Sequence, residues 1–351
     1  MTPVILLTGF LGSGKTTLLQ RLLRHPSMEG TAVLVNEFGE VGLDHHLLDQ
    51  IDENVVLLKS GCICCTVRGE VADALANLHS MRTRGEISFE RVVIETTGLA
   101  DPYPVLQTLT AHPVLRSHFS NGGVLTTVDT VNADIQVTHR AEAVRQIAAA
   151  DRIVLTKTDL AAPQEEEALR QRLLRVNPAA NIITSMSSVE TILADFGPLS
   201  FFTSSKSATQ NHICGPGCGH DAPTKCDSLT DQHRHHDETF GVTSFSLEIE
   251  GGIDWTMFGT WLTLLLHKYG DRIFRVKGIL AIEGEALPIA IHGVQHLIHA
   301  PTHMDHWPKG MDQSGSKSSH LIFILEDIEP EKIRRSFHAF MNVDTVKAAA
   351  R

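Results

Sequence analysis

Short apolar runs alternate with stretches of helical periodicity along the first part of the chain. Runs rich in β-branched residues predict strands at 4–8, 32–36, 55–58, 91–95, 124–128, 152–156 and 181–184. Amphipathic stretches between several of these runs predict helices at 16–23, 71–81, 141–149 and 165–176. This alternation indicates an α/β fold in which helices cover both faces of a mainly parallel sheet.

A segment without periodicity separates this part from the rest. Residues 203–239 are rich in Ser, Gly, Pro, His and Asp, a composition typical of a flexible linker. Beyond it, strands are predicted at 242–249, 273–282, 287–292 and 321–325, and helices at 254–267 and 331–340. The helix predicted at 254–267, the first after the linker, carries an apolar stripe that we expect to be core: Trp255, Phe258, Trp261, Leu262 and Leu265. This order predicts a small α+β domain with helices on one face of its sheet.

Composition narrows the class of protein. The chain has 351 residues, of which 42% are hydrophobic and 20% charged, as in a globular protein. Its net charge of -11 argues against a nucleic-acid partner, because phosphate backbones attract basic surfaces. The opening residues, MTPVILLTGFLGSG, lack the basic start of a signal peptide, and no apolar run approaches the ~18 residues of a membrane span. We therefore expect a cytoplasmic protein whose six cysteines are reduced.

The sequence GFLGSGKT at 9–16 matches the phosphate-binding pattern G-x-x-x-x-G-K-[ST], between a predicted strand and a predicted helix. In such a loop, backbone N–H groups and the start of the helix bind phosphate oxygens. Lys15 would contact the β- and γ-phosphates, and the Thr16 hydroxyl would ligate Mg²⁺. The residues expected at the nucleotide are Gly9, Gly12, Ser13, Gly14, Lys15, Thr16 and Thr17.

Two later strand ends complete the expected nucleotide site. RVVIETTG at 91–98 places Glu95 where an acid would hold Mg²⁺, and the Gly98 N–H where it would meet the γ-phosphate. LTKTDL at 155–160 offers Asp159, whose carboxylate can accept two hydrogen bonds from guanine that adenine does not offer. Lys157 would lie along the base, and Thr156 stands where Asn is usual. These residues favour GTP over ATP and predict a P-loop NTPase domain.

The motifs taken together resemble those of the CobW-type metallochaperone GTPases, relatives of the nickel-insertion GTPases of urease and hydrogenase. The resemblance rests on GFLGSGKTT, NEFGEVGLD at 36–44, GCICC at 61–65, ETTG, TKTD and the later RVKGIL and HGVQHLIHAPTHMDHWP. It implies a GTPase domain at 1–202, a linker at 203–239 and a CobW-like C-terminal domain at 240–345. It also implies that GTP and GDP control a transition-metal site whose metal passes to a client metalloprotein.

In that family pattern, 36–44 would be the first switch loop. Glu37 and Glu40 are candidates for sensing Mg²⁺ or positioning the attacking water, and a solvated loop is the alternative for each.

Cys62, Cys64 and Cys65 follow a predicted strand, so they should emerge at the same sheet edge as the phosphate loop. Thiolates suit Zn²⁺, Co²⁺ or Cu⁺, with Glu37 or water completing the shell, and the mixed Cys and His content favours Zn²⁺. The alternatives are buried apolar cysteines or a redox disulfide, although the spacing is not that of Cys-x-x-Cys.

Histidines form two further groups. In the linker, His212, Cys214, Cys218 and His220 have spacing found at zinc sites, and a soluble segment with adventitious metal binding is the alternative. The histidines at 292, 296, 299, 303 and 306 would form a stripe on a helix, but Gly293 and Pro301 favour strand and turn, so we do not expect a metal site there.

Three other functions remain open at the level of sequence. The protein could be a metal store or sensor that binds nucleotide without significant turnover. It could handle cobalt, in cobalamin synthesis or as a nitrile hydratase activator. A P-loop kinase of small molecules is the third, and Asp159 argues against it because a kinase would favour ATP.

Overall fold

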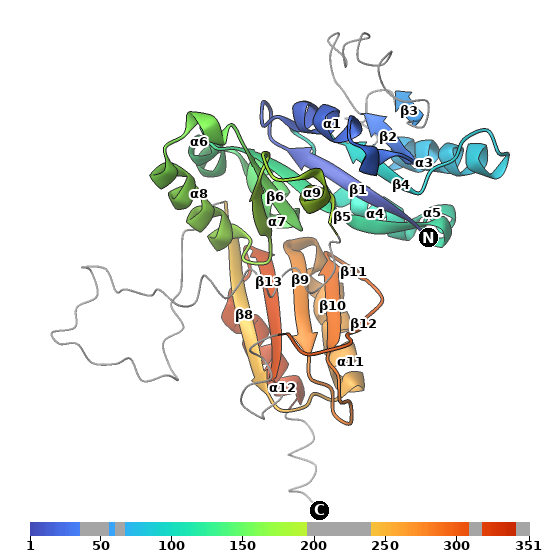
Figure 1. Ribbon diagram of the computed structural model, residues 1–351. Coiled ribbons are helices and arrows are strands. Elements are labelled where there is room, and N and C mark those ends of the chain that lie inside the picture. Colours follow the sequence, from blue (N-terminus) through green and yellow to red (C-terminus); the bar gives the residue numbers. More distant parts are fainter. Residues whose placement is uncertain (36–55, 60–66, 195–239, 309–317, 342–351) are drawn as a thin grey trace, which may run out of the picture.

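The computed structural model describes residues 1–35, 56–59, 67–194, 240–308 and 318–341, which form two sheets (Figure 1). We call the described residues up to 194 the N-terminal domain and those from 240 onward the C-terminal domain. The predicted linker at 203–239 lies outside the described residues, so the predicted domain limits stay predictions. Within the described residues, no helix is both long and apolar enough to cross a membrane.

The N-terminal sheet has seven strands in the order β3-β2-β4-β1-β5-β6-β7, and every neighbouring pair is parallel. The strands are β1 (Thr2–Gly9), β2 (Thr31–Val35), β3 (Val56–Lys59), β4 (Arg91–Glu95), β5 (Phe119–Asp129), β6 (Arg152–Thr156) and β7 (Asn181–Thr184). A parallel sheet is buried on both faces, which is why its strands read as continuous apolar runs.

Helices cover both faces of this sheet. Ile5 and Leu7 of β1 pack toward α1 (Lys15–Leu23) and α9 (Val189–Leu193), whereas Val4 and Leu6 face the opposite layer. That opposite layer contains α3 (Val67–Thr83), α4 (Tyr103–Ala111), α5 (Pro113–His118), α6 (Ala133–His139), α7 (Ala141–Ala149) and α8 (Pro163–Val176). Short 3-10 turns lie at Pro26–Met28 and Thr158–Leu160. The predicted α/β fold is confirmed, whereas α4, α5, α6 and α9 were not predicted. Helices α5, α6 and α9 have at most seven residues, too few for a clear helical period.

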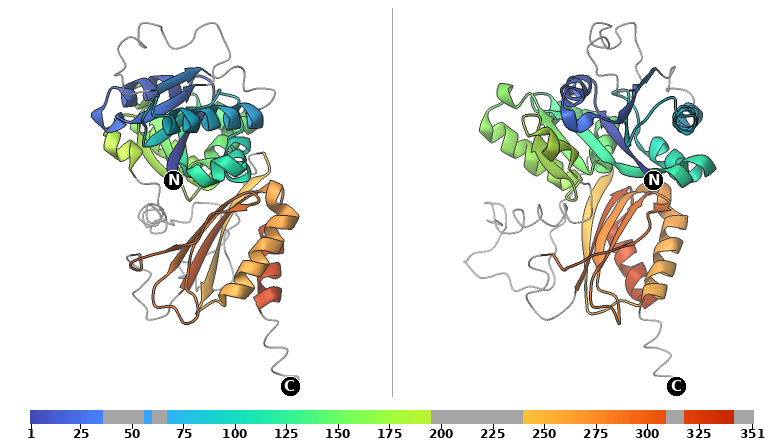
Figure 2. Two further views of the ribbon diagram at one scale, coloured as in Figure 1. Left: turned by 90° about the vertical axis from the view of Figure 1, so that its right-hand side faces the viewer. Right: turned by 45° about the vertical axis from the view of Figure 1, so that its right-hand side comes forward.

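The C-terminal sheet is antiparallel, in the order β11-β10-β9-β13-β8, with β12 beside β10. Its strands are β8 (Val242–Glu250), β9 (Ile273–Leu280), β10 (Ile289–Val294), β11 (Leu297–Ile298), β12 (Thr302–His303) and β13 (Ser318–Glu326). Helices α11 (Trp255–Tyr269) and α12 (Pro330–Met341) pack on one face, with a 3-10 turn at Gly270–Arg272 after α11 (Figure 2). This confirms the predicted α+β domain.

Trp261 is the centre of the apolar layer between this sheet and its helices. It is 2% exposed, stacks edge-on against Phe337 at 4.9 Å between ring centroids, and donates from Nε1 to Ser336 Oγ at 3.0 Å. The expectation that Trp255 is core was wrong, because it is 39% exposed at the first residue of α11, just after the helix-capping Asp254. Strands β10 and β12 contain His292 and His303, so the rejection of a helical histidine stripe is confirmed.

The two domains share an apolar core. Phe274, Val294 and Ile324 of the C-terminal domain belong to the same cluster of buried side chains as the helical layer of the N-terminal domain. Phe274 stacks on Tyr103 at 5.1 Å between ring centroids. At the margin of this contact, Arg145 pairs with Glu326, with Nη2 and Oε1 2.9 Å apart. The interface therefore resembles a domain interior more than a surface contact.

One carboxylate and two cations are buried at the same interface. Asp151 Oδ1 accepts hydrogen bonds from Lys277 Nζ at 2.6 Å and from Arg275, and Oδ2 accepts from the Val124 N–H at 3.0 Å. Arg275 also donates to the Ala149 carbonyl. Burial alone would raise the pKa of Asp151, but Arg275 and Lys277 hold it well below its usual value. Burial lowers the pKa of Lys277 to about 8, with Arg275 adding to the effect.

Replacing Asp151 with Asn should destabilise the protein strongly, because two buried cations would lose their only carboxylate among the described residues. We expect Asp151→Asn to lower the free energy of unfolding by about 3–5 kcal/mol, measured by urea denaturation. Asp134→Asn is the matched control, since Asp134 pairs with Arg172 on the surface and should change stability by about 0–1 kcal/mol. A loss below about 1 kcal/mol in Asp151→Asn would contradict the account.

Candidate functional site

The loops that follow β1, β4, β5 and β6 meet at the carboxyl edge of the parallel sheet. The strand register brings Leu7 beside Glu95, Gly9 beside Thr127, and Asp129 beside Thr156. The carboxyl edge is where open parallel sheets bind ligands. Most of the nucleotide-site residues predicted from sequence lie in these loops or at the start of α1.

The phosphate loop depends on glycine at three positions. Gly9, Gly12 and Gly14 have φ values of 145°, 73° and 85°, in a region that side chains disfavour. A Cβ on Gly9 would also overlap the hydroxyl of Thr127. Gly14 precedes α1, and no described side chain caps the first amides of this helix. These N–H groups at the positive helix end fit a phosphate.

Buried hydroxyls fix the back of the loop to neighbouring strands. Ser13 Oγ and Thr127 Oγ1 lie 2.7 Å apart, and Thr156 Oγ1 donates to the Ser13 carbonyl at 2.8 Å. Thr156, which stands where Asn is usual, therefore ties the end of β6 to the phosphate loop. Thr17 follows within α1.

Lys15, Thr16 and Glu95 converge beside the loop. Lys15 Nζ donates to the carbonyls of Gly9 and Phe10 at 2.9 and 3.1 Å. Thr16 Oγ1 donates to Glu95 Oε1 at 2.7 Å, and Glu95 is only 2% exposed. A hydroxyl and a carboxylate in contact are the oxygen donors that Mg²⁺ prefers, so these residues fit that ion.

Gly98 lies directly against the phosphate loop. A Cβ there would approach the Leu11 backbone N to 2.7 Å, so only glycine fits without a shift. Gln146 of α7 donates from Nε2 to the carbonyls of Gly98 and Ala100 at 3.1 and 3.0 Å. Gln146 is 1% exposed and was not predicted from sequence, because a single amide in an amphipathic helix carries no motif.

The loop that follows β6 contains an ion pair that was not predicted from sequence. Lys157 has a φ of 56°, and its Nζ lies 2.7 Å from Asp129 Oδ2. Asp129 also accepts from Asn132 Nδ2 at 2.8 Å. Burial alone would raise the pKa of Asp129, but these hydrogen bonds lower it below its usual value. The signal available was an acid at the end of a buried strand. Asp159 is exposed in the same loop.

The remaining predicted site residues lie outside the described residues. These are Glu37, Glu40, the three cysteines of the Cys-x-Cys-Cys motif and the four linker residues His212, Cys214, Cys218 and His220. All six cysteines of the chain fall there. Among the described residues, no group of three or more His, Cys, Asp or Glu side chains could hold a metal ion. The metal sites therefore stay predictions.

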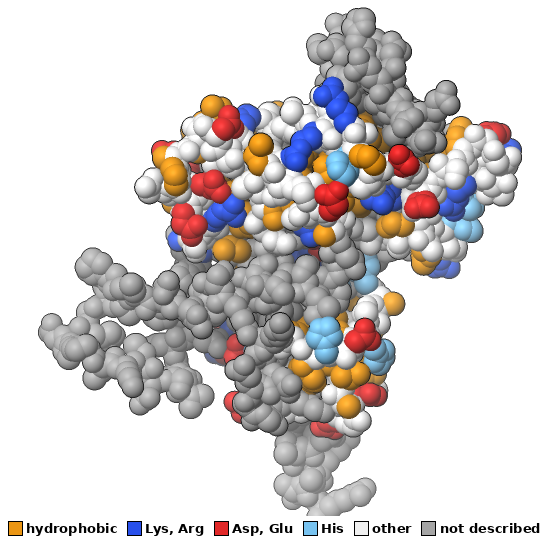
Figure 3. All heavy atoms as spheres, in the orientation of Figure 1, with side chains coloured by type: hydrophobic (Ala, Val, Ile, Leu, Met, Phe, Trp, Pro, Cys, Tyr) orange, Lys and Arg blue, Asp and Glu red, His pale blue; other side chains and the backbone are white. Residues whose placement is uncertain are grey.

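The surface of the N-terminal domain carries mixed charge on the face shown in Figure 3. Basic and acidic side chains alternate there, and neither sign forms a continuous patch. The absence of a nucleic-acid partner stays a prediction from the net charge.

Two family models match the chain. The model of the CobW/HypB/UreG nucleotide-binding domain matches residues 3–184, and that of the cobalamin synthesis protein CobW C-terminal domain matches residues 242–341. Together they span the two sheets described above.

Individual relatives extend the match to nearly the whole length. The zinc chaperone YjiA of Escherichia coli is 35% identical over 339 residues, covering 95% of this chain and 97% of that protein. The zinc chaperone CobW of Pseudomonas aeruginosa is 29% identical, covering 83% and 80%. The crystal structure of the Zn(II)-bound YjiA GTPase matches with a TM-score of 0.68 at 31% identity, covering 97% of this chain and 99% of that one. The chain therefore belongs to the CobW/HypB/UreG family, with the family's nucleotide-binding domain followed by a CobW C-terminal domain.

Proposed function

We propose that the protein is a GTP-hydrolysing metallochaperone that binds Zn²⁺ at Cys62, Cys64 and Cys65 and delivers it to a client protein. The nucleotide state controls binding and release, and hydrolysis is slow until a client accelerates it. The names of the relatives support zinc as the metal. They include two zinc chaperones and the zinc-regulated GTPase metalloprotein activator 1 of Schizosaccharomyces pombe, which is 38% identical over 188 residues.

Strand register is the observation that carries this proposal. Lys59 at the end of β3 pairs with Val35, and Val35 pairs with Glu95. Neighbouring strands lie about 4.8 Å apart, so Lys59 is about 10 Å from Glu95 across the sheet. Cys62 follows Lys59 by three residues, a stretch that spans at most about 10 Å. This supports a thiolate site near the carboxylate that contacts Thr16.

The reaction is the attack of water on the γ-phosphate of GTP, giving GDP and phosphate. Mg²⁺ held by Thr16 and Glu95 would neutralise charge on the phosphate oxygens. Lys15 binds the β- and γ-phosphates, and the Gly98 N–H donates to the γ-phosphate. Preorganised donors of this kind stabilise the transition state electrostatically. Glu37 and Glu40 are the candidates for orienting water.

Coupling between nucleotide and metal would run through residues 36–44. This segment joins β2, beside Glu95, to the chain that leads into the cysteines. In the GTP state its acids are held near Mg²⁺, and Glu37 or water completes the thiolate shell. Loss of the γ-phosphate releases the segment, as in other GTPase switches, and weakens the metal site. A store or sensor would lack this dependence on nucleotide.

The coupling predicts that metal affinity depends on nucleotide state. Co²⁺, a visible substitute for Zn²⁺, should bind at least about tenfold more tightly with Mg²⁺ and a non-hydrolysable GTP analogue than with GDP, a difference of about 1.4 kcal/mol. The thiolate-to-cobalt absorption band reports binding. Cys64→Ser should abolish the band, whereas Cys226→Ser in the predicted linker should retain it. Equal affinity in both nucleotide states would instead support a store or sensor.

Lys15→Ala should lower kcat for GTP hydrolysis at least about 100-fold, because loss of one preorganised transition-state donor typically costs 10²–10³. Phosphate release under saturating GTP measures the effect. Lys268→Ala, which removes an exposed cation in α11, is the control and should hydrolyse GTP as the wild type does. If Lys15→Ala still transfers metal in a GTP-dependent manner, the proposed mechanism is wrong.

Asp159→Asn should change base specificity. A carboxamide keeps one acceptor and gains a donor, so it suits xanthine better than guanine. We expect GTP affinity to fall about 100-fold, since a hydrogen bond to a charged group contributes about 1.5–3 kcal/mol, and XTP affinity to rise. Competition with a fluorescent nucleotide measures both. Asp271→Asn, on the exposed surface of the C-terminal domain, should leave both affinities unchanged. Unchanged GTP preference in Asp159→Asn would remove Asp159 from base recognition.

A further inference from the structure

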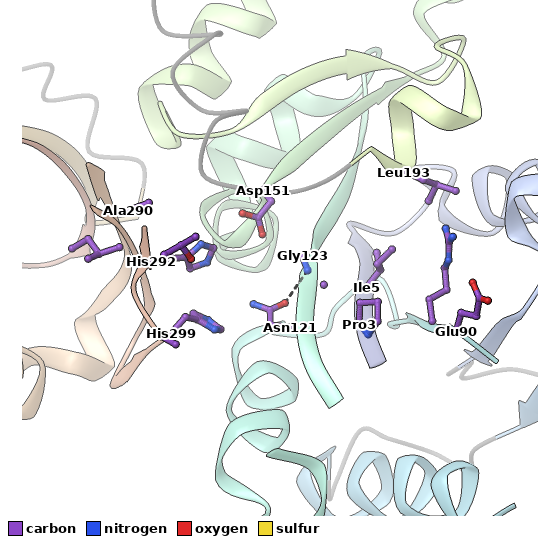
Figure 4. A pocket seen from close by; sticks show the side chains of 15 residues that line it. Pro3, Ile5, Glu90, Asn121, Gly123, Asp151, Leu193, Ala290, His292 and His299 are labelled. Carbon is purple, nitrogen blue, oxygen red and sulfur yellow. Dashed lines mark hydrogen bonds between the residues drawn. The ribbon is translucent and has the colours of Figure 1, made fainter. Parts of the chain in front are cut away.

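A cleft of about 590 Å³ lies between the two domains, at the end of the parallel sheet away from the phosphate loop. Residues at the start of β1 and within β5 line one side, including Pro3 and Asn121, and residues of β10 and the segment after it line the other. In Figure 4 the rings of His292 and His299 extend from the C-terminal sheet toward Asp151 and Asn121. The cleft has the volume of a small-molecule site, and nothing in the proposed reaction uses it.

The charges beside this cleft do not balance. Asp151, Arg275 and Lys277 are each at most 5% exposed, so two positive charges face one negative charge inside the protein. His292 and His299 add no charge near neutral pH, because burial lowers the pKa of both. Buried charges are normally matched, so a surplus cation indicates a missing counterion.

Several cationic donors also lack partners among the described residues. Within the described part of the chain, Lys277 Nζ donates only to Asp151 Oδ1, which leaves two of its three N–H groups without a protein acceptor there. Arg275 Nε is buried without a hydrogen bond. His292 Nε2 lies 3.4 Å from Arg275 Nη2, which can only donate, so the ring proton of His292 sits on Nδ1 and is a further donor.

The same contacts argue against a metal cation in the cleft. Asp151 already accepts three hydrogen bonds from protein groups, so its carboxylate has little capacity left to ligate a metal. The neighbouring Arg275 and Lys277 would repel a cation. At the outer end, Glu90 and Arg91 contribute opposite charges that offset each other.

We propose that this interdomain cleft binds a small polyatomic oxyanion, held by the imidazoles of His292 and His299 and by the surplus positive charge of the Asp151, Arg275 and Lys277 cluster. The ligand touches both domains and stabilises their contact. An inorganic oxyanion and an organic carboxylate share this chemistry, so two probes separate them.

The test is calorimetric titration of the full-length protein, saturated with GDP and Mg²⁺ so that the phosphate loop is filled. Sodium sulfate and sodium malonate are titrated separately at constant ionic strength. We expect one saturable site per chain, and the tighter probe identifies the source as inorganic or carboxylate. Lys277→Met should weaken binding at least tenfold, whereas Lys268→Met, an exposed change of the same kind, should weaken it less than twofold.

His299→Gln is the second variant, because it leaves the buried charges intact if Lys277→Met does not fold. It should weaken binding at least threefold. Absence of a saturable site for both probes overturns the proposal, as does unchanged affinity in Lys277→Met and His299→Gln. Zn²⁺ binding that persists in Cys64→Ser and disappears on adding His299→Gln would also overturn it, since a cation would then occupy the cleft.

Discussion

The parallel direction of every strand in the seven-stranded sheet is the constraint on which the nucleotide site depends. Because all carboxyl ends meet at one edge, Thr16 and Glu95 contact each other at 2.7 Å although 79 residues separate them. The same constraint buries both faces of the inner strands, and β2 and β6 are buried at every position. The strand Arg91–Glu95 shows the result, four buried positions that end in the acid of the site.

Local signals explain which features were predictable. Strands β4, β6 and β7 were predicted with their observed limits because each is a β-branched run between polar segments. The phosphate loop was predictable because its glycines and lysine are fixed in spacing by backbone geometry. Asp129 was not, since an acid after a strand looks like a turn residue until Lys157 is placed beside it. Periodicity likewise placed Trp255 in the core, but it does not say where along a helix the packed surface begins.

The contact between the domains combines apolar and ionic interactions that sequence patterns do not reveal. Tyr103 and Phe274 stack across this contact. Asp151 accepts hydrogen bonds from Arg275 and Lys277, which both lie in β9. Each partner lies more than 120 residues from Asp151, and Arg275 and Lys277 look like exposed positions of an alternating strand. The N-terminal domain covers these two side chains, so their burial follows from the packing of the two domains and not from the local sequence pattern.

Helix α7 connects the loop after β4 to the antiparallel sheet. Its Gln146 holds the carbonyls of Gly98 and Ala100, its Arg145 pairs with Glu326, and its Ala149 carbonyl accepts from Arg275. Nine residues of α-helix measure about 13 Å, too short to bend appreciably. The helix therefore links the two domains rigidly. If the loop at Gly98 and Ala100 moves, either these hydrogen bonds break or the C-terminal sheet moves with the loop.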